Sequence, residues 1–402
     1  MTVEFLIGDV REQLRLLPAE SFDCVVTSPP YWGLRDYEVD GQIGLERTLG
    51  EHLAVMVDVF REVRRVLKRH GTLWLNYGDC YAAAPNGKSA AAYKADGTDD
   101  RTFRDKPFST VGPIYDPAYN RTPRKHFVAS DRQSRMETGG RVVAGGYLKP
   151  KDLCMIPNRL AIALQDDGWW VRSEIIWHKP NPMPESVYDR PTVAHEKVWL
   201  LTKGEDYFYN HEAIREPVTG STHRRMAQNV DAQAGSTRAN GGTRPDRPMK
   251  ASVRKANGGP KVALAGASGV DRGKRSFLAC ADDSGETRNA RNVWKIAPKA
   301  FREAHFATFP PALAERCIKA GVPLTTCSLC GSAQLPEDCG GMCSTIPRQP
   351  GRVLDPFGGA GTVGLVAEQL GLDCTLIELN PGYAEMAHRR IYGAASMLEA
   401  AE

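Results

Sequence analysis

A short turn near the start of the chain has the parts needed to hold an aromatic amine. Residues 27–32 read TSPPYW and directly follow an apolar run. Pro29 and Pro30 have no backbone N–H, so their carbonyl oxygens can face a ligand without competing in a sheet. Ser28 and the Pro29 carbonyl could accept both N–H groups of a planar amine while Tyr31 stacks on its ring. The nitrogen lone pair would then be free to attack an electrophilic carbon; a Pro-Pro turn with a packed aromatic is the alternative.

A glycine-rich turn supplies a second candidate binding element. Residues 354–364 read LDPFGGAGTVG, which indicates a strand, a tight turn and a helix that begins near Thr362. Its glycines satisfy G-x-G-x-x-G, and Glu378 closes the next strand about twenty residues later, where a carboxylate can accept hydrogen bonds from ribose hydroxyls. The pattern predicts a nucleotide-like cofactor. A ligand-free turn that needs glycine only for its tight geometry is the alternative.

The elements that must position these turns have the pattern of an α/β sheet. Short apolar runs predict strands, and apolar residues that recur every three or four positions predict helices. The expected strands are residues 3–7, 22–27, 72–77, 171–177, 197–202, 353–355 and 374–378, and the expected helices include residues 52–68 and 159–166. Because ligands of such sheets bind at the carboxyl ends of parallel strands, we expect both turns at one edge of one sheet.

The composition is that of a globular protein. The chain has 402 residues, of which 42% are hydrophobic and 25% are charged, so it can bury a core without help from disulfides or metals. No apolar run approaches the roughly 18 to 20 residues of a membrane helix. The first ten residues carry no basic segment before an apolar stretch, which argues against a secretory signal. We expect a cytoplasmic protein with no membrane partner.

Two stretches, residues 82–149 and 212–291, lack sustained apolar periodicity and are rich in Gly, Ser, Asn and basic residues. Between Arg215 and Lys295 there are about sixteen Lys and Arg residues and about seven Asp and Glu residues, so the net charge of +4 is concentrated there. Such a segment suits a polyanion, and a solvated loop is the alternative.

Together the two turns resemble the signature of the amino-directed DNA methyltransferases that use S-adenosylmethionine. Residues 28–31, SPPY, look like the family's catalytic motif, and residues 355–361, DPFGGAG, look like its cofactor motif. Their order is that of the family's beta group, as are Gly8-Asp9 and residues 305–310, HFATFP. The resemblance implies a Rossmann-like S-adenosylmethionine-dependent methyltransferase sheet in the α/β class, with circularly permuted motif order and loop-rich insertions.

The same resemblance implies roles for individual residues. The residues that would hold the target base are Ser28, Pro29, Pro30 and Tyr31. The residues that would bind the cofactor are Asp9 at the adenine amino group, Glu378 at the ribose, Asp355, Phe357, Gly358, Gly359 and Gly361 in the motif around the methionine part, and Thr308, Phe309 and Pro310, which would close the pocket. No P-loop lysine follows the last glycine, which fits a sulfonium cofactor that carries no phosphate.

The expected reaction is a direct displacement on the amino group of a flipped base. It needs no cysteine nucleophile, and Cys24 is predicted to be a packed core residue. Ser28 at the first motif position favours cytosine N4 in this family, with adenine N6 as the alternative. Residues 177–183, WHKPNPM, resemble the family's loop around the flipped base, whereas His195 and Glu196 are assigned no chemistry.

The resemblance also divides the chain. The expected parts are a catalytic half at residues 1–82 and 150–212, a flexible insertion at 83–149, a basic insertion at 213–291 where the family places its target-recognition region, and a cofactor-binding half at 292–402. The expected macromolecular substrate is double-stranded DNA. A homodimer, as is frequent in the beta group, and a cognate restriction enzyme are candidate partners.

A cysteine loop at residues 321–349 resembles a metal site. Cys327, Cys330, Cys339 and Cys343 have the spacing C-x2-C-x8-C-x3-C, close to that of four-thiolate zinc sites. Zinc held by four thiolates would be structural, because no position remains open for water. A reduced loop without metal is the alternative.

Three other functions compete with this interpretation. A non-catalytic nucleic-acid-binding protein with a zinc knuckle would not need both the Pro-Pro-Tyr turn and Glu378. A methyltransferase of RNA or of protein glutamine could hold a planar amine in the same way, but the basic insertion favours DNA. A nicotinamide dehydrogenase would have its glycine turn near the start of a continuous βαβαβ unit.

Overall fold

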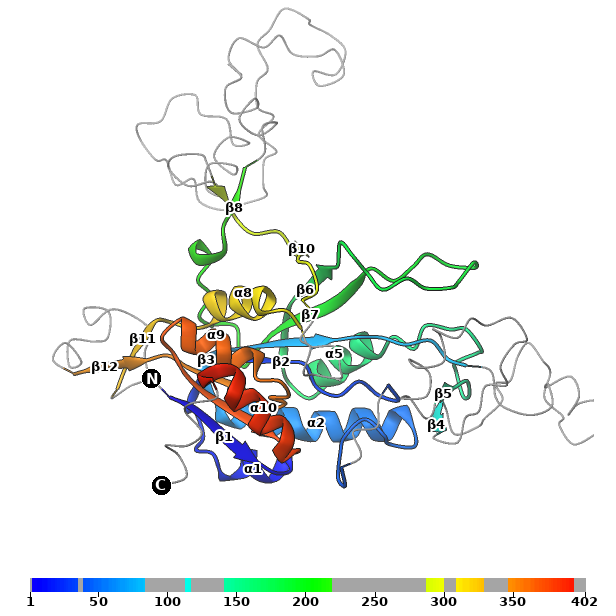
Figure 1. Ribbon diagram of the computed structural model, residues 1–402, viewed down its shortest axis with the longest axis horizontal. Helices are drawn as coiled ribbons and strands as arrows, with labels where there is room; N and C mark the ends of the chain where they lie inside the picture. The colour runs from blue at the N-terminus through cyan, green and yellow to red at the C-terminus, as the bar shows by residue number, and fades with distance from the viewer. Residues whose placement is uncertain are drawn as a thin grey trace, which may run out of the picture. The chain divides into compact units, whose positions relative to one another are not determined.

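One mixed β-sheet forms the framework of the protein (Figure 1). The computed structural model describes residues 2–34, 39–83, 113–116, 141–218, 287–299, 309–328 and 346–393. The strands, in their order across the sheet, are β1 (Val3–Ile7), β14 (Asp373–Glu378), β13 (Arg352–Asp355), β2 (Phe22–Thr27), β3 (Leu67–Tyr77), β7 (His195–Thr202), β6 (Trp170–His178) and β10 (Val293–Lys295). The strands from β1 to β3 in this order are parallel, whereas β7 is antiparallel to both of its neighbours.

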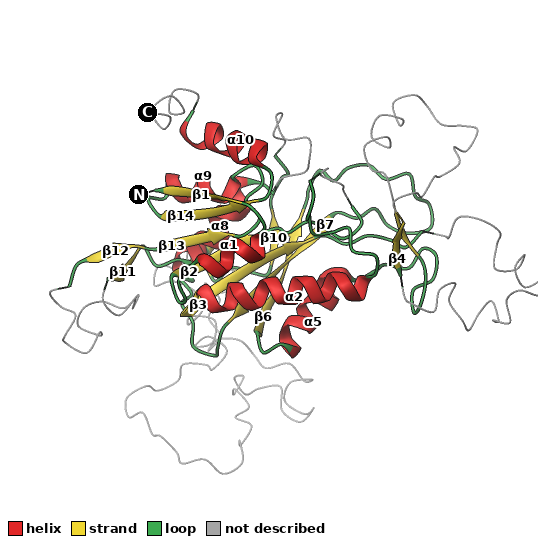
Figure 2. Cartoon of the chain, turned by 90° about the horizontal axis from the view of Figure 1, so that it is seen from below, coloured by secondary structure: helices red, strands yellow, loops and turns green. Residues whose placement is uncertain are grey.

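Two sets of helices cover the sheet. The first set is α1 (Val10–Leu16), α2 (Leu49–Val66) and α5 (Ile156–Asp166), and the second is α8 (Pro311–Gly321), α9 (Thr362–Gln369) and α10 (Pro381–Tyr392). Helix α2 packs on α1, α5 and β3, and α9 packs on α8, α10 and β14, so the sets lie on opposite faces (Figures 1 and 2). Within the part of the chain that the structure describes, no helix is both long and apolar enough to cross a membrane. The α/β prediction is confirmed.

The expected strands are present, but the bounds of two helices differ from the prediction. The helix expected at residues 52–68 begins at Leu49 because Thr48 and Glu51 form a capping box, each side chain accepting the other's backbone N–H. It ends at Val66 because Lys68 already belongs to β3. The helix expected from residue 159 begins at Ile156, with a proline in its first turn.

Two short antiparallel strand pairs lie where no strands were expected. Strands β4 (Ile114–Asp116) and β5 (Arg141–Val143) pair antiparallel within the predicted insertion at residues 83–149. Strands β11 (Thr325–Cys327) and β12 (Arg348–Pro350) pair antiparallel at the two ends of the cysteine loop. Their three-residue length explains why periodicity did not reveal them, since a period of two needs a longer run to be recognised.

The chain forms two compact units, residues 1–210 with 292–402 and residues 211–291. The described part of the smaller unit contains the 3-10 turn η1 (Glu212–Ile214) and an antiparallel pair, β8 (Glu216–Pro217) and β9 (Thr287–Arg288). Glu216 forms an ion pair with Arg291 there, at 2.9 Å. The rest of the predicted basic insertion lies outside the described residues.

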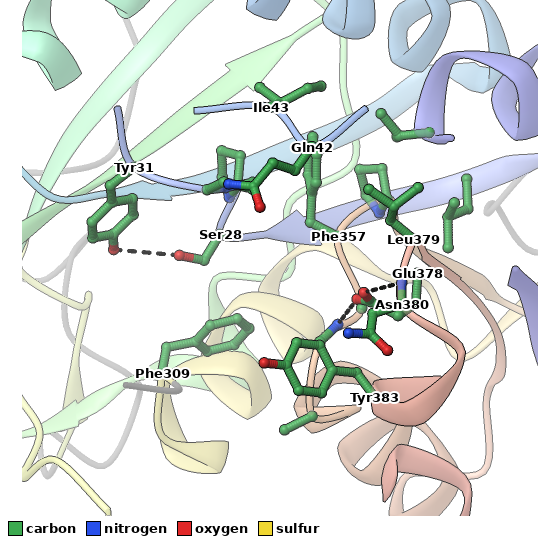
Figure 3. Close-up of a pocket in the computed structure, with 18 of the residues that line it drawn as sticks. Ser28, Tyr31, Gln42, Ile43, Phe309, Phe357, Glu378, Leu379, Asn380 and Tyr383 are labelled. Carbon is green, nitrogen blue, oxygen red and sulfur yellow. Dashed lines mark hydrogen bonds between the residues drawn. The ribbon is translucent and has the colours of Figure 1, made fainter. Parts of the chain in front are cut away.

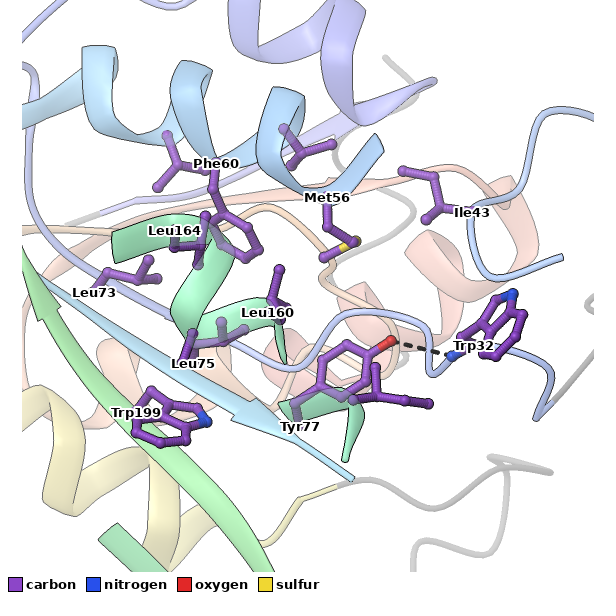
Figure 4. Close-up of a cluster of buried hydrophobic side chains, with 14 of the residues drawn as sticks. Trp32, Ile43, Met56, Phe60, Leu73, Leu75, Tyr77, Leu160, Leu164 and Trp199 are labelled. Atoms are coloured by element: carbon purple, nitrogen blue, oxygen red, sulfur yellow. Dashed lines mark hydrogen bonds between the residues drawn. The ribbon is translucent and has the colours of Figure 1, made fainter. Parts of the chain in front are cut away.

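The apolar core lies between the sheet and the first set of helices (Figure 4). Strand β2 is buried along its whole length, so its residues pack on both faces of the sheet. Cys24 in this strand is fully buried, and burial raises the pKa of its thiol to about 12. The burial of Cys24 confirms the prediction that it is a core residue. Because its thiol keeps its proton, Cys24 is also chemically inert.

Strands from the two ends of the chain pair with one another in the same sheet, as the permuted motif order predicts. β1 pairs with β14 from Val3 opposite Cys374 onward, and β13 pairs with β2. Asp23 in β2 ties the pairing together: its carboxylate accepts hydrogen bonds from Lys68 Nζ at 2.9 Å, from a ring nitrogen of His70 at 3.1 Å and from Arg352 N at 2.9 Å.

We predict that Asp23→Ala lowers the free energy of unfolding by about 3–5 kcal/mol, because it leaves the buried Lys68 ammonium without a partner. Chemical denaturation monitored by circular dichroism measures this loss. The control is Asp58→Ala, which removes an exposed partner of Arg61 and is expected to change stability by less than about 0.5 kcal/mol. Equal stability of the two variants would contradict the role of Asp23.

Candidate active site

A cleft lies at the carboxyl edge of the parallel strands (Figure 3). The segments that line it lie at or just after the ends of β1, β2, β13 and β14, namely residues 8–10, 28–31, 356–360 and 378–380. The antiparallel hairpin adds Trp177 and Lys179 from the end of β6 and Glu196 from the start of β7. The two turns therefore share one edge of one sheet, as the sequence predicts.

The structure brings most of the predicted site residues into this cleft. The predicted residues that line it are Asp9, Ser28, Pro29, Pro30, Tyr31, Phe309, Phe357, Gly358, Gly359 and Glu378. Pro310, Asp355 and Gly361 are described but do not line it. Thr308 lies outside the described residues.

Tyr31 is the centre of the polar cluster at one end of the cleft. Its hydroxyl lies 2.9 Å from Glu196 Oε2 and 3.3 Å from both Asn76 Oδ1 and Ser28 Oγ. Burial, together with the negative charge of Glu196, raises the pKa of Tyr31 well above 10. Gly78 makes room for the Tyr31 ring, because a Cβ at this position would overlap the ring.

Glu196, to which the sequence assigned no chemistry, belongs to this cluster together with Lys179 from the predicted loop at residues 177–183. Lys179 Nζ forms an ion pair with Glu196 Oε1 and lies 4.6 Å from the centre of the Trp177 ring. Asn76 Nδ2 donates to the other carboxylate oxygen at 3.2 Å. The signal that could have revealed Glu196 is its place at the start of a strand, which reaches the cleft only because that strand is antiparallel.

A buried chain of hydrogen bonds holds the Pro-Pro turn from behind. The Tyr77 hydroxyl donates to the Pro30 carbonyl at 3.1 Å and accepts from Trp32 N at 3.1 Å (Figure 4). His52 Nε2 lies 2.7 Å from the same hydroxyl, and His52 Nδ1 lies 2.8 Å from the Glu46 carboxylate. Pro30 has no N–H and cannot donate a backbone hydrogen bond to the sheet. The hydrogen bond from Tyr77 to the Pro30 carbonyl fixes the turn instead.

The glycine turn depends on a buried carboxylate beneath it. Asp355 Oδ1 accepts the Thr27 hydroxyl at 2.7 Å and the Phe357 N–H at 3.0 Å. Burial raises the pKa of Asp355 to about 7, although these hydrogen bonds act to lower it. Gly361 has a φ of +69° and faces Ala387, so it is needed for the turn and for packing and has no place on the cleft wall.

The other end of the cleft suits a nucleoside-like cofactor. Glu378 accepts the Gly359 N–H at 2.7 Å and the Asn380 N–H at 2.9 Å, which orients its carboxylate at the cleft wall (Figure 3). Burial raises the pKa of Glu378, against the effect of these N–H groups. Among the described residues that line the cleft, Lys179 is the single Lys or Arg, and it lies at the opposite end beside Glu196. A sulfonium fits this donor set better than a pyrophosphate does.

Asp9 and Phe309 occupy different parts of the cleft wall. Asp9 caps α1, and hydrogen bonds from the Arg11 side chain hold the pKa of its carboxyl below the usual value. Phe309 and Tyr383 lie across the cleft from Ser28 (Figure 3). The sequence did not single out Tyr383, Gln42 or Asn380, which also line the cleft.

The predicted zinc ligands are only partly described. Cys327 is buried in β11, whereas Cys330, Cys339 and Cys343 lie outside the described residues. Within the described ranges no cluster of three His, Cys, Asp or Glu residues could hold a metal ion. Zinc at the cysteine loop stays a prediction.

Comparison with known proteins identifies the family. A family model for N6- and N4-methyltransferases, described as DNA methylase, matches residues 22–389. The chain belongs to this family. The Type II methyltransferase M.SmaI of Serratia marcescens is 35% identical over 388 residues, which cover 96% of this chain and 90% of that protein. M.XycI of Xanthomonas campestris pv. cyanopsidis is 36% identical over 390 residues, covering 97% and 87%.

Two solved structures show partial similarity to the chain. The PvuII DNA methyltransferase, described as cytosine-N4-specific, is 16% identical, covers 96% of this chain and 85% of its own, and has a TM-score of 0.49. TTHA0409 of Thermus thermophilus, complexed with S-adenosyl-L-methionine, is 19% identical, with coverage of 97% and 93% and a TM-score of 0.43. The expected resemblance to amino-directed DNA methyltransferases is thus confirmed by the family match.

We predict that Tyr77→Phe lowers the free energy of unfolding by about 1–3 kcal/mol, because buried groups at Pro30, Trp32 and His52 lose their partner. Urea unfolding measures the difference. Tyr188→Phe removes the same oxygen from a fully exposed side chain and is the matched control, with no expected change. A Tyr77→Phe protein as stable as the control would show that this chain of hydrogen bonds contributes nothing.

Asp355 makes stability depend on pH. Its raised pKa means that the folded protein holds a proton that the unfolded chain releases near pH 4, so the contribution of Asp355 falls as pH rises from about 4 to about 7, by up to about 1.4 kcal/mol per pH unit. Asp355→Asn keeps an acceptor for Thr27 and Phe357 but cannot ionise. We expect the stability of this variant relative to wild type to rise by about 2 kcal/mol between pH 5 and pH 8. Stability curves that stay parallel across this window would refute the assignment.

Proposed function

We propose that the protein transfers a methyl group from S-adenosylmethionine to the exocyclic amino group of a base in a specific DNA sequence, most specifically to cytosine N4. The observation that carries this proposal is the arrangement of the cleft. Ser28 and Tyr31 lie at one end with Glu196 behind them, and Glu378 with the glycine turn lies at the other. A base and a nucleoside cofactor would thereby meet in one enclosed space.

Different residues of the cleft would bind the cofactor and the target base. When bound, S-adenosylmethionine supplies an electrophilic methyl group on a sulfonium. Glu378 would accept ribose hydroxyls, Asp9 the adenine amino group, and residues 357–359 would line the methionine part. Ser28 and the Pro29 carbonyl would accept the two amino hydrogens of the target base, and Tyr31 would stack on its ring. Phe309 and Tyr383 would exclude water from the far wall.

The choice of base rests on Ser28. In the family that the chain resembles, serine at this motif position is usual for cytosine N4 and aspartate for adenine N6. A neutral hydroxyl also suits the cluster, since Glu196 already supplies one negative charge beside Tyr31. Adenine N6 is the alternative outcome.

The substrate and the partners follow from the same proposal. Double-stranded DNA would present its target base flipped out of the stack, at a cost of a few kcal/mol. The predicted basic insertion at residues 213–291 would contact phosphates and act as the target-recognition region. The relatives are Type II methyltransferases, which supports a cognate restriction enzyme as partner and a cytoplasmic location. A homodimer and a structural zinc at the cysteine loop complete the proposal. The family match offers no support for a non-catalytic zinc-containing nucleic-acid-binding protein.

The test is to incubate the protein with S-adenosylmethionine and unmethylated duplex DNA and to digest the DNA to nucleosides. Mass spectrometry is expected to find N4-methylcytosine. Finding N6-methyladenine alone would overturn the choice of base, and finding no methylated nucleoside would overturn the proposal.

Ser28→Ala is expected to slow methyl transfer by about 100-fold or more, because the amino group loses an acceptor that orients it. Affinity for S-adenosylmethionine, measured by calorimetry, should stay within about twofold, since Glu378 and the glycine turn are untouched. Ser21→Ala is the matched control, because the Ser21 hydroxyl bonds the Pro18 carbonyl away from the cleft. Wild-type activity in Ser28→Ala would refute the role of Ser28.

A further inference from the structure

The hydrogen bonds around Tyr31 have a direction. Its hydroxyl has one proton, and Glu196 Oε2 at 2.9 Å is nearer than either Asn76 Oδ1 or Ser28 Oγ at 3.3 Å. The carboxylate is also the only charged group of the three. The proton therefore points to Glu196, because charge-assisted hydrogen bonds are the shorter and stronger ones.

The direction extends to Ser28. The buried Tyr31 phenol keeps its proton at neutral pH, since burial and the charge of Glu196 both raise its pKa. With that proton given to Glu196, the Tyr31 oxygen can only accept from the Ser28 hydroxyl. The Ser28 proton then points to Tyr31, and the lone pairs of Ser28 face the cleft.

Two neighbours hold the Glu196 carboxylate in place. Lys179 Nζ pairs with Oε1, and Asn76 Nδ2 donates to Oε2. The Asn76 amide is itself oriented, because its Nδ2 also donates to the Lys197 carbonyl at 3.2 Å. The Asn76 Oδ1 atom therefore faces the Tyr31 hydroxyl. Because this oxygen can only accept, Asn76 cannot donate a proton to Tyr31 and so cannot change the direction of its hydrogen bonds.

We infer that the Glu196 carboxylate, paired with Lys179, sets the hydrogen-bond polarity of the base pocket, so that Ser28 accepts from the ligand and the pocket selects an exocyclic amino group over a carbonyl at the same ring position. Cytosine and adenine fit this polarity, whereas uracil and thymine place an oxygen against the lone pairs of Ser28. Glu196 is a positioning residue, because it acts through Tyr31. The inference rests on the proposed function, since it concerns the pocket for the target base.

Glu196→Gln tests the inference. Lys179 still requires an acceptor, so the amide oxygen of the new side chain faces Lys179 and its NH2 faces Tyr31. The Tyr31 hydroxyl can then no longer donate to residue 196, and its proton is free to turn toward Ser28. The Ser28 hydroxyl is then no longer fixed as an acceptor toward the cleft. The probes are short oligodeoxycytidine and oligodeoxyuridine strands of equal length at mildly alkaline pH, which are unpaired and need no flipping and no recognition sequence.

Fluorescence anisotropy measures the affinity of the full chain for both probes. Wild type is expected to bind oligodeoxycytidine at least about tenfold more tightly than oligodeoxyuridine. The difference arises because uracil places its oxygen against the Ser28 oxygen, so that two acceptors face each other in a buried site. In Glu196→Gln the ratio of the two affinities should fall to about one. If Glu196 had only a structural role, Glu196→Gln would weaken the binding of both strands alike and would leave this ratio unchanged.

Two further variants sharpen the test. Glu174→Gln makes the same chemical change on the same hairpin, where Glu174 pairs with Lys197 at 2.5 Å outside the cleft, and should keep the wild-type ratio. Tyr31→Phe removes the middle hydroxyl and keeps the ring, so it should lower the ratio as far as Glu196→Gln does. The double variant should lower it no further, because both changes break one chain of hydrogen bonds.

The inference is overturned if wild type binds the two strands equally or if Glu196→Gln keeps the wild-type ratio. Should Glu196→Gln fail to fold, an unchanged ratio in Tyr31→Phe overturns it. Methylation is not the readout, so the outcomes stay separate. A chain that methylates no DNA refutes the proposed function, and an unchanged ratio refutes only the role of Glu196.

Discussion

The register between β2 and β13 is the constraint on which the cleft depends. Cys24 lies opposite Val353 in this pairing, which joins segments from the two ends of the sequence. It places Thr27 beside Asp355, and that single carboxylate oxygen then holds the end of β2 and the start of the glycine turn. A slip of one residue would turn every side chain of one strand to the other face, so the two turns would lose their common edge.

The carboxylates of the cleft are neutralised in different ways at its two ends. Glu196 has the Lys179 ammonium as partner. Glu378 has only backbone N–H groups, and Asp355 beneath the turn has a hydroxyl and one N–H. Burial without a cation raises the pKa of both Glu378 and Asp355. A positively charged sulfonium would supply the countercharge that Glu378 lacks among the described residues.

The sequence was enough to predict the sheet, the place of both turns and most of the cleft residues that follow parallel strands. Those predictions used features that are local in the chain, such as the Pro-Pro turn and the glycines. Glu196 could not be predicted in this way, because it lies at the start of its strand and reaches the cleft only through the antiparallel course of β7. His52 was equally hidden. It lies on the buried face of α2, and its role behind the turn appears only through its tertiary contacts with Tyr77 and Glu46.

The central position of β2 has a consequence for the synthesis of the protein. This strand is buried throughout, yet β3 is its only neighbour until the ribosome has passed Asp355, because β13 is made so late. An apolar strand edge is therefore open for most of translation, and such edges invite pairing with other chains. Closing the sheet requires contacts between segments far apart in sequence, which form slowly. The cleft therefore forms only after β13 and β14 have been synthesised, because the segments at the ends of these strands make one of its walls.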